Sequence, residues 1–223
     1  MRVLGRWLAL CLTLTPAARA DVLGGGWTHD LDLSTAFGSG TVTTAFSETS
    51  AFGLFDGRLR LGAGPRLLGV FGPDDAAFTT ANAGLISSGA VNTITASKVR
   101  IGALNLALSA RVRIVAGLEL GANIDVIGVG FGPSRAVTAT TGNFQGVHTA
   151  APPAFNLLAL GRNDKGALDS EFHLSYWFGE RLVVRAGVSH LVTELVTTQP
   201  LDDGNDRFRR VSTLFFVAGG YRL

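Results

Sequence analysis

Residues 111–130, RVRIVAGLELGANIDVIGVG, alternate between two kinds of side chain. The even positions from Val112 to Val126 are all apolar, whereas most odd positions are charged, polar or glycine: Arg113, Gly117, Glu119, Gly121, Asn123 and Asp125. In an extended strand, a period of two places the two sets on opposite faces. At about 3.3 Å per residue, residues 112–128 reach roughly 55 Å, which at a tilt of about 45° crosses a bilayer and stands clear of it. The stretch therefore predicts a membrane-crossing β-strand.

The first residues have the order of a secretory signal peptide. Arg2 and Arg6 precede an apolar run at 7–14, and Ala18-Arg19-Ala20 supplies small residues at a cleavage point. We expect cleavage after Ala20, so that residues 1–20 are a signal peptide and residues 21–223 form one mature domain. Cys11 leaves with the signal, so the mature chain has no disulfide.

The charge and hydropathy of the mature chain exclude several classes of protein. Of the 19 Lys and Arg residues, Arg2, Arg6 and Arg19 leave with the signal, so 16 basic residues remain beside 17 acidic ones, a net charge of −1. This balance does not indicate nucleic-acid binding, so we expect none. Mean hydropathy is +0.32, but no later run of about eighteen apolar residues could form a transmembrane helix. An exported, apolar chain with long alternating stretches is typical of a membrane β-barrel.

Three segments share the pattern Arg, apolar, any, apolar, any, small, Gly, and we interpret each as a tight turn entering a strand: residues 57–64, 110–117 and 180–187. With one further strand at each end, they predict an all-β fold, an eight-stranded antiparallel up-and-down transmembrane β-barrel. The expected strands are residues 22–36, 43–55, 58–72, 98–109, 111–130, 167–178, 181–195 and 208–222. The remaining connections are rich in Ala, Thr, Ser, Gly and Asp and are expected to be extracellular loops: residues 37–42, 73–97, 131–166 and 196–207. In the fourth strand the apolar residues change parity after Ala103, which predicts a bulge near Gly102.

The last strand ends Phe215-Phe216-Val217-Ala218-Gly219-Gly220-Tyr221-Arg222-Leu223. This ending resembles the C-terminal strand of the small eight-stranded outer-membrane β-barrel protein superfamily, in which Phe usually stands at the place of Leu223. The resemblance implies that the chain lies in the cell outer membrane, in contact with outer-membrane lipid. It also implies insertion by the barrel-assembly machinery, with a C-terminal insertion signal formed by Phe215, Val217, Tyr221 and Leu223.

With the apolar face toward lipid, ten charged side chains fall on the inner face and are expected to form a lumen charge network: Asp30, Asp32, Arg60, Arg66, Arg113, Glu119, Asp125, Glu171, Arg185 and Arg210. Unpaired buried charge is costly, so we expect ion pairs that fill a narrow lumen. One alternative is a narrow channel or lateral port for small apolar molecules. Another is a secreted lipocalin-like carrier with an apolar interior, because Gly25-Gly26-Trp27 matches the G-x-W of lipocalins.

One group of residues suggests catalysis: Glu171, His173 and Ser175. His173-Leu174-Ser175 resembles the His-x-Ser of outer-membrane lipid A deacylases. Side chains at i and i+2 of a strand stand roughly 6 to 7 Å apart, and parity turns all three toward the lumen, so we expect no enzymatic activity. No histidine pair has metal-ligand spacing and no cofactor motif is present, so we expect neither a metal nor a cofactor. The acidic run at 202–206 is interpreted as a hydrated turn. The expected role is structural or one of surface interaction, and an extracellular ligand would bind to loops 73–97 and 131–166.

Overall fold

The computed structural model describes residues 26–81, 91–140, 145–161, 163–200, 204 and 206–223. Its regular secondary structure consists of strands: β1 (Trp27–Gly38), β2 (Thr41–Leu54), β3 (Leu59–Phe71), β4 (Ala76–Thr80), β5 (Thr93–Ala96), β6 (Arg100–Val115), β7 (Leu118–Phe131), β8 (Arg135–Ala139), β9 (Gly146–Ala151), β10 (Asn156–Leu157), β11 (Leu168–Phe178), β12 (Leu182–Thr197) and β13 (Arg207–Arg222). Within the described ranges, no helix has the length and apolar character to cross a membrane. The expected signal peptide at 1–20, the following residues 21–25 and most of the acidic run at 202–206 lie outside the described residues.

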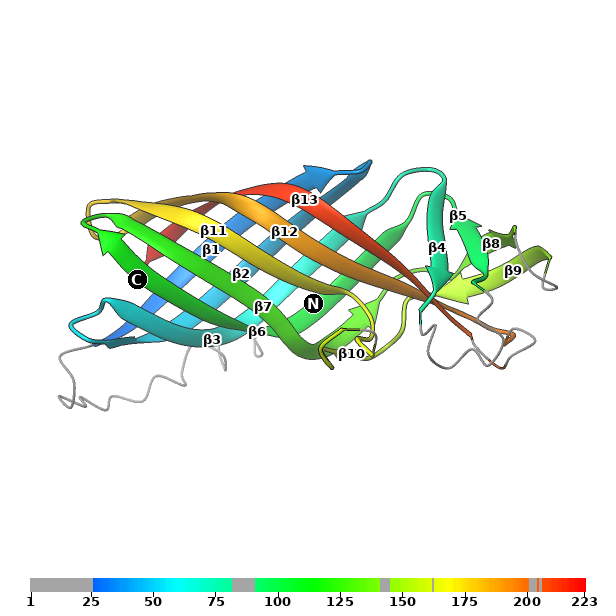
Figure 1. Ribbon diagram of the computed structural model, residues 1–223, viewed down its shortest axis with the longest axis horizontal. Helices are drawn as coiled ribbons and strands as arrows, with labels where there is room; N and C mark the ends of the chain where they lie inside the picture. Colours follow the sequence, from blue (N-terminus) through cyan, green and yellow to red (C-terminus); the bar gives the residue numbers. More distant parts are fainter. Residues whose placement is uncertain (1–25, 82–90, 141–144, 162, 201–203, 205) are drawn as a thin grey trace, which may run out of the picture.

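The thirteen strands form one antiparallel sheet that closes into a ring (Figure 1). The ring runs through β1, β2, β3, β6, β7, β11, β12 and β13, and pairing of β13 with β1 closes it. Short turns connect these strands at one end, which we call the turn end. The longer connections gather at the opposite end, the loop end. The prediction of a closed, antiparallel, all-β sheet is therefore confirmed. The loop predicted at 37–42 is wrong: β1 and β2 pair through these positions and are joined by a two-residue turn at Ser39 and Gly40.

The connections 73–97 and 131–166 contain strands where the sequence predicts loops. β4 and β5 lie in the first connection, and β8, β9 and β10 lie in the second. β4 pairs with β13 and β9 pairs with β12, while β5 and β8 link them, so these strands form a second, smaller ring at the loop end. Sequence reasoning missed them because strands of four to six residues show too few alternations to differ from a loop.

The interior of this small ring is an apolar core. Its buried side chains come from the short strands and from the loop-end parts of β12 and β13: Ala76, Phe78, Ile94, Ala96, Val137, Ala139, Ala150, Leu195 and Phe208. Short side chains alternate with the two phenylalanines, which lets strands pack closely around a narrow axis. This core is continuous with buried apolar side chains of the large ring, such as Leu68, Val70 and Ile101.

The predicted tight turn at Ala110 and Arg111 is wrong. β6 continues through these residues to Val115, and the turn lies at Ala116 and Gly117. Gly117 has φ of +79°, a conformation that glycine adopts without steric cost. The other two predicted turns lie where the sequence placed them, at 55–58 and 179–181.

The bulge predicted near Gly102 is absent, and β6 alternates without interruption there. The parity of the apolar residues changes because the inward side chains of β6 change from apolar to polar along the strand. Ile101 and Ala103 are buried on the inner face, and the same parity continues through Asn105 to Arg111, which are also buried. Inward side chains on β6 are therefore apolar toward the loop end and polar toward the turn end. The register does shift farther along, where Val126 of β7 is the extra residue.

The outer face of the large ring is apolar and exposed. On β11, the outward side chains are each about half exposed, namely Phe172, Leu174, Tyr176 and Phe178, whereas His173 and Ser175 between them are buried. On β7, Leu120 is 53% exposed, while Glu119 is 3% and Asp125 0% exposed. A lipocalin-like carrier requires the opposite orientation of these residues.

Candidate functional site

Arg66 is the centre of a buried ion cluster inside the large ring. β3 points its side chain inward, where the guanidinium meets Asp169 Oδ2 at 2.9 Å, Asp125 Oδ1 at 3.7 Å and a carboxylate oxygen of Glu171. All four residues are almost completely buried. One cation thus joins carboxylates from β7 and β11, two strands that do not pair with β3.

Amides and a hydroxyl supply the further hydrogen bonds that three carboxylates around one cation require. Asn105 Nδ2 donates to Asp125 at 2.7 Å, Asn123 Nδ2 donates to Glu171 at 2.8 Å, and Ser189 Oγ donates to Asp169. Asn156 Nδ2 of β10 donates to Asn105 Oδ1 at 2.8 Å, which ties the cluster to the segment that precedes β11. Side-chain donors from β6, β7 and β12 therefore stabilise the carboxylates directly, and Asn156 of β10 holds one of these donors in place.

A second buried cluster lies nearer the turn end. Asp30 of β1 accepts from Arg111 Nη1 at 2.7 Å and from Arg222 Nε at 2.8 Å. Asp32 pairs with Arg185 of β12, across the intervening strand β13. Gly220 occupies the facing position on β13, and the absence of a side chain there leaves the space through which Asp32 reaches Arg185.

Glu119 and Trp177 extend this cluster to the mouth at the turn end. Glu119 Oε1 lies 3.5 Å from Arg60 Nη1, and its Oε2 accepts a hydrogen bond of 2.9 Å from Trp177 Nε1. The guanidinium carbon of Arg222 stands 3.9 Å from the centre of the Trp177 ring, a cation–π contact. A hollow of about 480 Å³ opens at the turn end of the ring, with Arg60, Glu119 and Trp177 in its wall.

The structure brings together most of the residues predicted for the lumen charge network. Eight of them are in the buried ion pairs described above: Asp30, Asp32, Arg60, Arg66, Glu119, Asp125, Glu171 and Arg185. Two are elsewhere. Arg113 pairs in register with Glu119 and keeps the inward parity of β6, but it lies at the turn-end mouth and is exposed there. Arg210 donates to the backbone carbonyl of Ser39 at 2.9 Å, in the turn between β1 and β2.

Sequence reasoning missed three charged members of these clusters. Arg111 was assigned to a turn that does not exist there, although it shares the parity of Asn105 and Ser109. Asp169 shares the parity of Glu171, and Arg222 shares that of Gly220. Asp169 and Arg222 lie within the strands predicted at 167–178 and 208–222, and Arg111 lies one alternation beyond the strand predicted at 98–109, so following the alternation to each strand end would have found all three.

His173 and Ser175 are closer than the sequence argument allows. Strand spacing predicts roughly 6 to 7 Å, but His173 Nδ1 lies 3.0 Å from Ser175 Oγ, because both side chains lean along the strand. Glu171, the third member of the suspected group, contacts Arg66 and Asn123 instead. Both His173 and Ser175 are enclosed, at 2% and 1% exposed.

A third ion cluster lies outside the ring wall, at the loop end. Glu194 of β12 is fully buried and accepts from Arg207 Nη2 at 2.8 Å and from Arg209 Nη2 at 3.0 Å. The same two arginines donate to the backbone carbonyl of Asp164, and the N–H of Gly166 donates to Glu194 Oε2 at 3.0 Å. These contacts hold the segment before β11 against β12 and β13.

The residues predicted as a C-terminal insertion signal point outward. Phe215, Val217, Tyr221 and Leu223 are 40% to 69% exposed on one face of β13. The N–H of Leu223 donates to the carbonyl of His29 at 2.9 Å, which joins the end of the chain to β1. Within the described part of the chain, no group of three or more potential ligands among His, Cys, Asp and Glu is placed to hold a metal ion.

No protein-family model matches the chain. No curated protein sequence matches it either. Solved structures that align with it include Neisserial surface protein A (NspA), with 8% identity over 90% of this chain and 96% of that one and a TM-score of 0.36. Two monoaromatic hydrocarbon channels also align, each with 11% identity: the TodX deltaS2S3 mutant over 95% and 91% of the two chains with a TM-score of 0.24, and CymD over 90% and 88% with a TM-score of 0.20. All three are outer-membrane β-barrel proteins.

Proposed function

We propose that this chain is an integral outer-membrane protein whose eight long strands form a transmembrane β-barrel with a lumen filled by side chains. Its role is structural or one of surface interaction, and it has no enzymatic activity. The turn end faces the periplasm, and the small ring stands outside the cell. The observation that carries the proposal is the inversion of polarity: exposed apolar side chains surround buried ion pairs.

The height of the apolar surface supports a membrane location. On β6, apolar residues and glycine occupy every outward position from Gly102 to Ile114. Twelve steps of about 3.3 Å make roughly 40 Å, which at a tilt of about 45° is a band roughly 28 Å tall. The apolar band of outer-membrane barrels is about 25 Å tall. Outer-membrane lipid is the proposed partner of this surface, and the barrel-assembly machinery would insert it through the outward residues of β13.

The filling of the interior supports a sealed barrel over a narrow channel. Toward the turn end the inner face holds ion pairs between strands, including Arg66 with Asp169 and Asp30 with Arg111. Toward the loop end the interior passes into the apolar core around Phe78 and Phe208, which are fully buried. An ion would have to cross both layers, and the apolar one offers it no polar partner.

The small ring supports a surface-interaction role. It places strands from both long connections in a defined arrangement beyond the apolar band. An extracellular ligand that binds to the connections 73–97 and 131–166 would therefore meet a surface preformed by β4, β5, β8 and β9.

Expression of the full chain in a Gram-negative host tests this proposal. We expect recovery in the outer-membrane fraction, with migration on gels that changes on heating. Recovery as a soluble periplasmic protein would contradict it. In planar bilayers the purified protein should carry no steady current. A steady current that changes in Glu119→Ala, but not in Glu48→Ala, would favour the channel alternative.

A further inference from the structure

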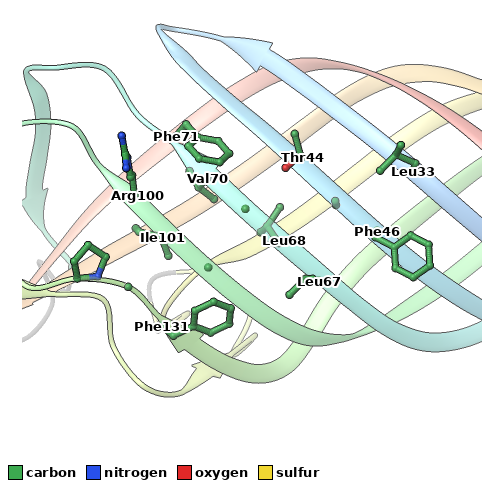
Figure 2. Close-up of a pocket in the computed structure, with 15 residues that line it drawn as sticks. Leu33, Thr44, Phe46, Leu67, Leu68, Val70, Phe71, Arg100, Ile101 and Phe131 are labelled. Atoms are coloured by element: carbon green, nitrogen blue, oxygen red, sulfur yellow. The ribbon is translucent and has the colours of Figure 1, made fainter. Parts of the chain in front are cut away.

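A trough crosses the outer face of the large ring, near its loop end. Thr44, Gly69, Gly102 and Phe131 face one another in register across β2, β3, β6 and β7. Larger side chains form the neighbouring rows, which are Val42, Phe71 and Arg100 on one side and Phe46, Leu67 and Leu104 on the other. Gly69 leaves space for a hollow of about 480 Å³ between these rows, whereas the ring of Phe131 lies over Gly102. Figure 2 shows Phe46, Phe71 and Phe131 standing around it.

The apolar walls alone do not select an occupant. A volume of about 480 Å³ lies within the range of small-molecule pockets, roughly 300 to 1,000 Å³. On a face that meets hydrocarbon, however, lipid tails already surround the trough, so the hydrophobic effect hardly favours an apolar ligand over a lipid tail. Close packing and charge must therefore decide which molecule stays in the trough.

Positive charge gathers at the loop-end side of the trough. Arg100 of β6 is part of its lining and is exposed, and Lys98, two residues earlier, is exposed as well. Arg135 of β8 donates to the backbone carbonyls of Ser97, Lys98 and Arg100, which brings a third cation to the same segment. Burial lowers the pKa of Arg135, and the charge of Arg100 adds to this shift, in agreement with their proximity.

Acidic residues do not cancel this charge. Asp74 and Asp75 follow β3 on the same rim and are exposed. No ion pair among the described residues joins either of them to Lys98 or Arg100. Three cations beside two carboxylates leave the rim with a net positive charge, at the level where the apolar band ends.

We propose that the trough holds one acyl chain of a phosphorylated, multiply acylated lipid of the outer leaflet, with a phosphate on Arg100 and Lys98. An acyl chain fills a long apolar hollow, and a guanidinium binds phosphate through charge-assisted hydrogen bonds. An uncharged hydrocarbon could fill the trough but would make no use of the positive charges of Arg100 and Lys98. A second copy of the chain would bring no phosphate to them. The inference rests on the proposed function, because it requires that the outer face meets lipid and that the loop end points outward.

Two variants with matched controls test the two parts of this site. Arg100→Gln removes the phosphate contact, and its control is Arg113→Gln, an exposed arginine at the other end of β6. Gly69→Leu fills the trough, since a Cβ there would lie 3.3 Å from Thr44 Oγ1 and 3.6 Å from the Phe71 ring without meeting backbone. Its control is Gly219→Leu on the outer face of β13, where a Cβ meets nothing within 4 Å.

The measurement is native mass spectrometry of each full-length protein in detergent, titrated with bis-phosphorylated lipid A, with lipid A lacking both phosphates, and with phosphatidylethanolamine. We expect one bound lipid A, and about tenfold weaker apparent affinity in Arg100→Gln and in Gly69→Leu. Both controls should bind as the unmodified protein does.

Several outcomes would overturn the inference. Equal binding of phosphorylated and dephosphorylated lipid A would show that the trough accepts any acyl chain. Unchanged binding in Arg100→Gln would remove the phosphate site. A dimer that disappears in Gly69→Leu would identify a second copy as the occupant. Any of these results in a protein that still fractionates with the outer membrane leaves the proposed function intact, whereas a soluble protein would remove both.

Discussion

Arg66 lies in the lumen with three carboxylates around its guanidinium and almost no access to water. Transfer of these charges into the barrel costs several kcal/mol for each ion, and their mutual attraction offsets that cost only while every partner is present. The stability of the protein is therefore expected to depend more on the positive charge of Arg66 than on the volume of its side chain.

Replacement of Arg66 by Met tests this dependence. The methionine fills much of the space, but Asp125, Asp169 and Glu171 lose their common cation, so we expect the free energy of unfolding to fall by about 3 to 5 kcal/mol. Urea unfolding in detergent, followed by tryptophan fluorescence, measures the change. Arg113→Met at the exposed turn-end mouth is the control and should change the midpoint little. Equal midpoints for the two variants would contradict the central role of Arg66.

The alternation of side chains predicts the inner face well in the middle of strands and poorly at their ends. It placed Asp30, Asp125 and Glu171 correctly, because several alternating neighbours on each side define their parity. Arg113 keeps the expected parity, since it pairs with Glu119, but it is exposed because it lies at the turn-end mouth. Neither Asn105 nor Asn156 carries a charge, so their part in holding Asp125 was invisible without the cross-strand register.

At the scale of elements, the turn between β6 and β7 shows how composition can mislead. Ala110-Arg111 matches the two real turns in residue pattern, yet it continues a strand. The pattern describes an alternating strand, which begins after the arginine at Arg58 and Arg181 and already includes it at Arg111, so it carries no requirement for a turn. The real turn requires a residue with positive φ at position 117, and glycine adopts that conformation at the least steric cost.

Insertion of a short epitope distinguishes the two positions. After Gly117 it would lengthen an exposed turn, which costs little, so the protein should still assemble. After Ala110 it would interrupt pairing of β6 with both β3 and β7 and displace Arg111 from Asp30. We expect assembly to fail there, seen as loss of heat-modifiable migration and of outer-membrane recovery. Failure of both insertions, or success of both, would speak against this assignment of the turn.

At the scale of the whole molecule, two rings share one wall. β12 and β13 belong to the large ring and also close the small ring. The large ring was predictable, because strands of 11 to 16 residues give long alternating patterns. The small ring was not, because its strands acquire their apolar core only from partners distant in the sequence, such as Phe78 with Phe208 of β13.

Truncation of Phe78 to Ala tests whether the small ring has stability of its own. Phe78 is fully buried there, and we expect a loss of about 3 to 5 kcal/mol from the missing contacts and the cavity. Limited proteolysis of intact outer membranes should then cut within 73–97 or 131–166, while heat-modifiable migration persists. Phe215→Ala, at an outward position that is 69% exposed, is the control. Simultaneous loss of heat-modifiable migration would mean that the two rings unfold as one unit.

The shared wall also affects how the chain reaches its native state. β13 comes last in sequence order, and it must pair with β1, β4 and β12. Neither ring can close until it arrives, so contacts such as Asp30 with Arg222 give the fold a high contact order and favour slow folding. During that interval β1 and β12 present unpaired edges, which attract other strands. The nascent protein should therefore depend on a periplasmic chaperone that keeps it from aggregating until closure.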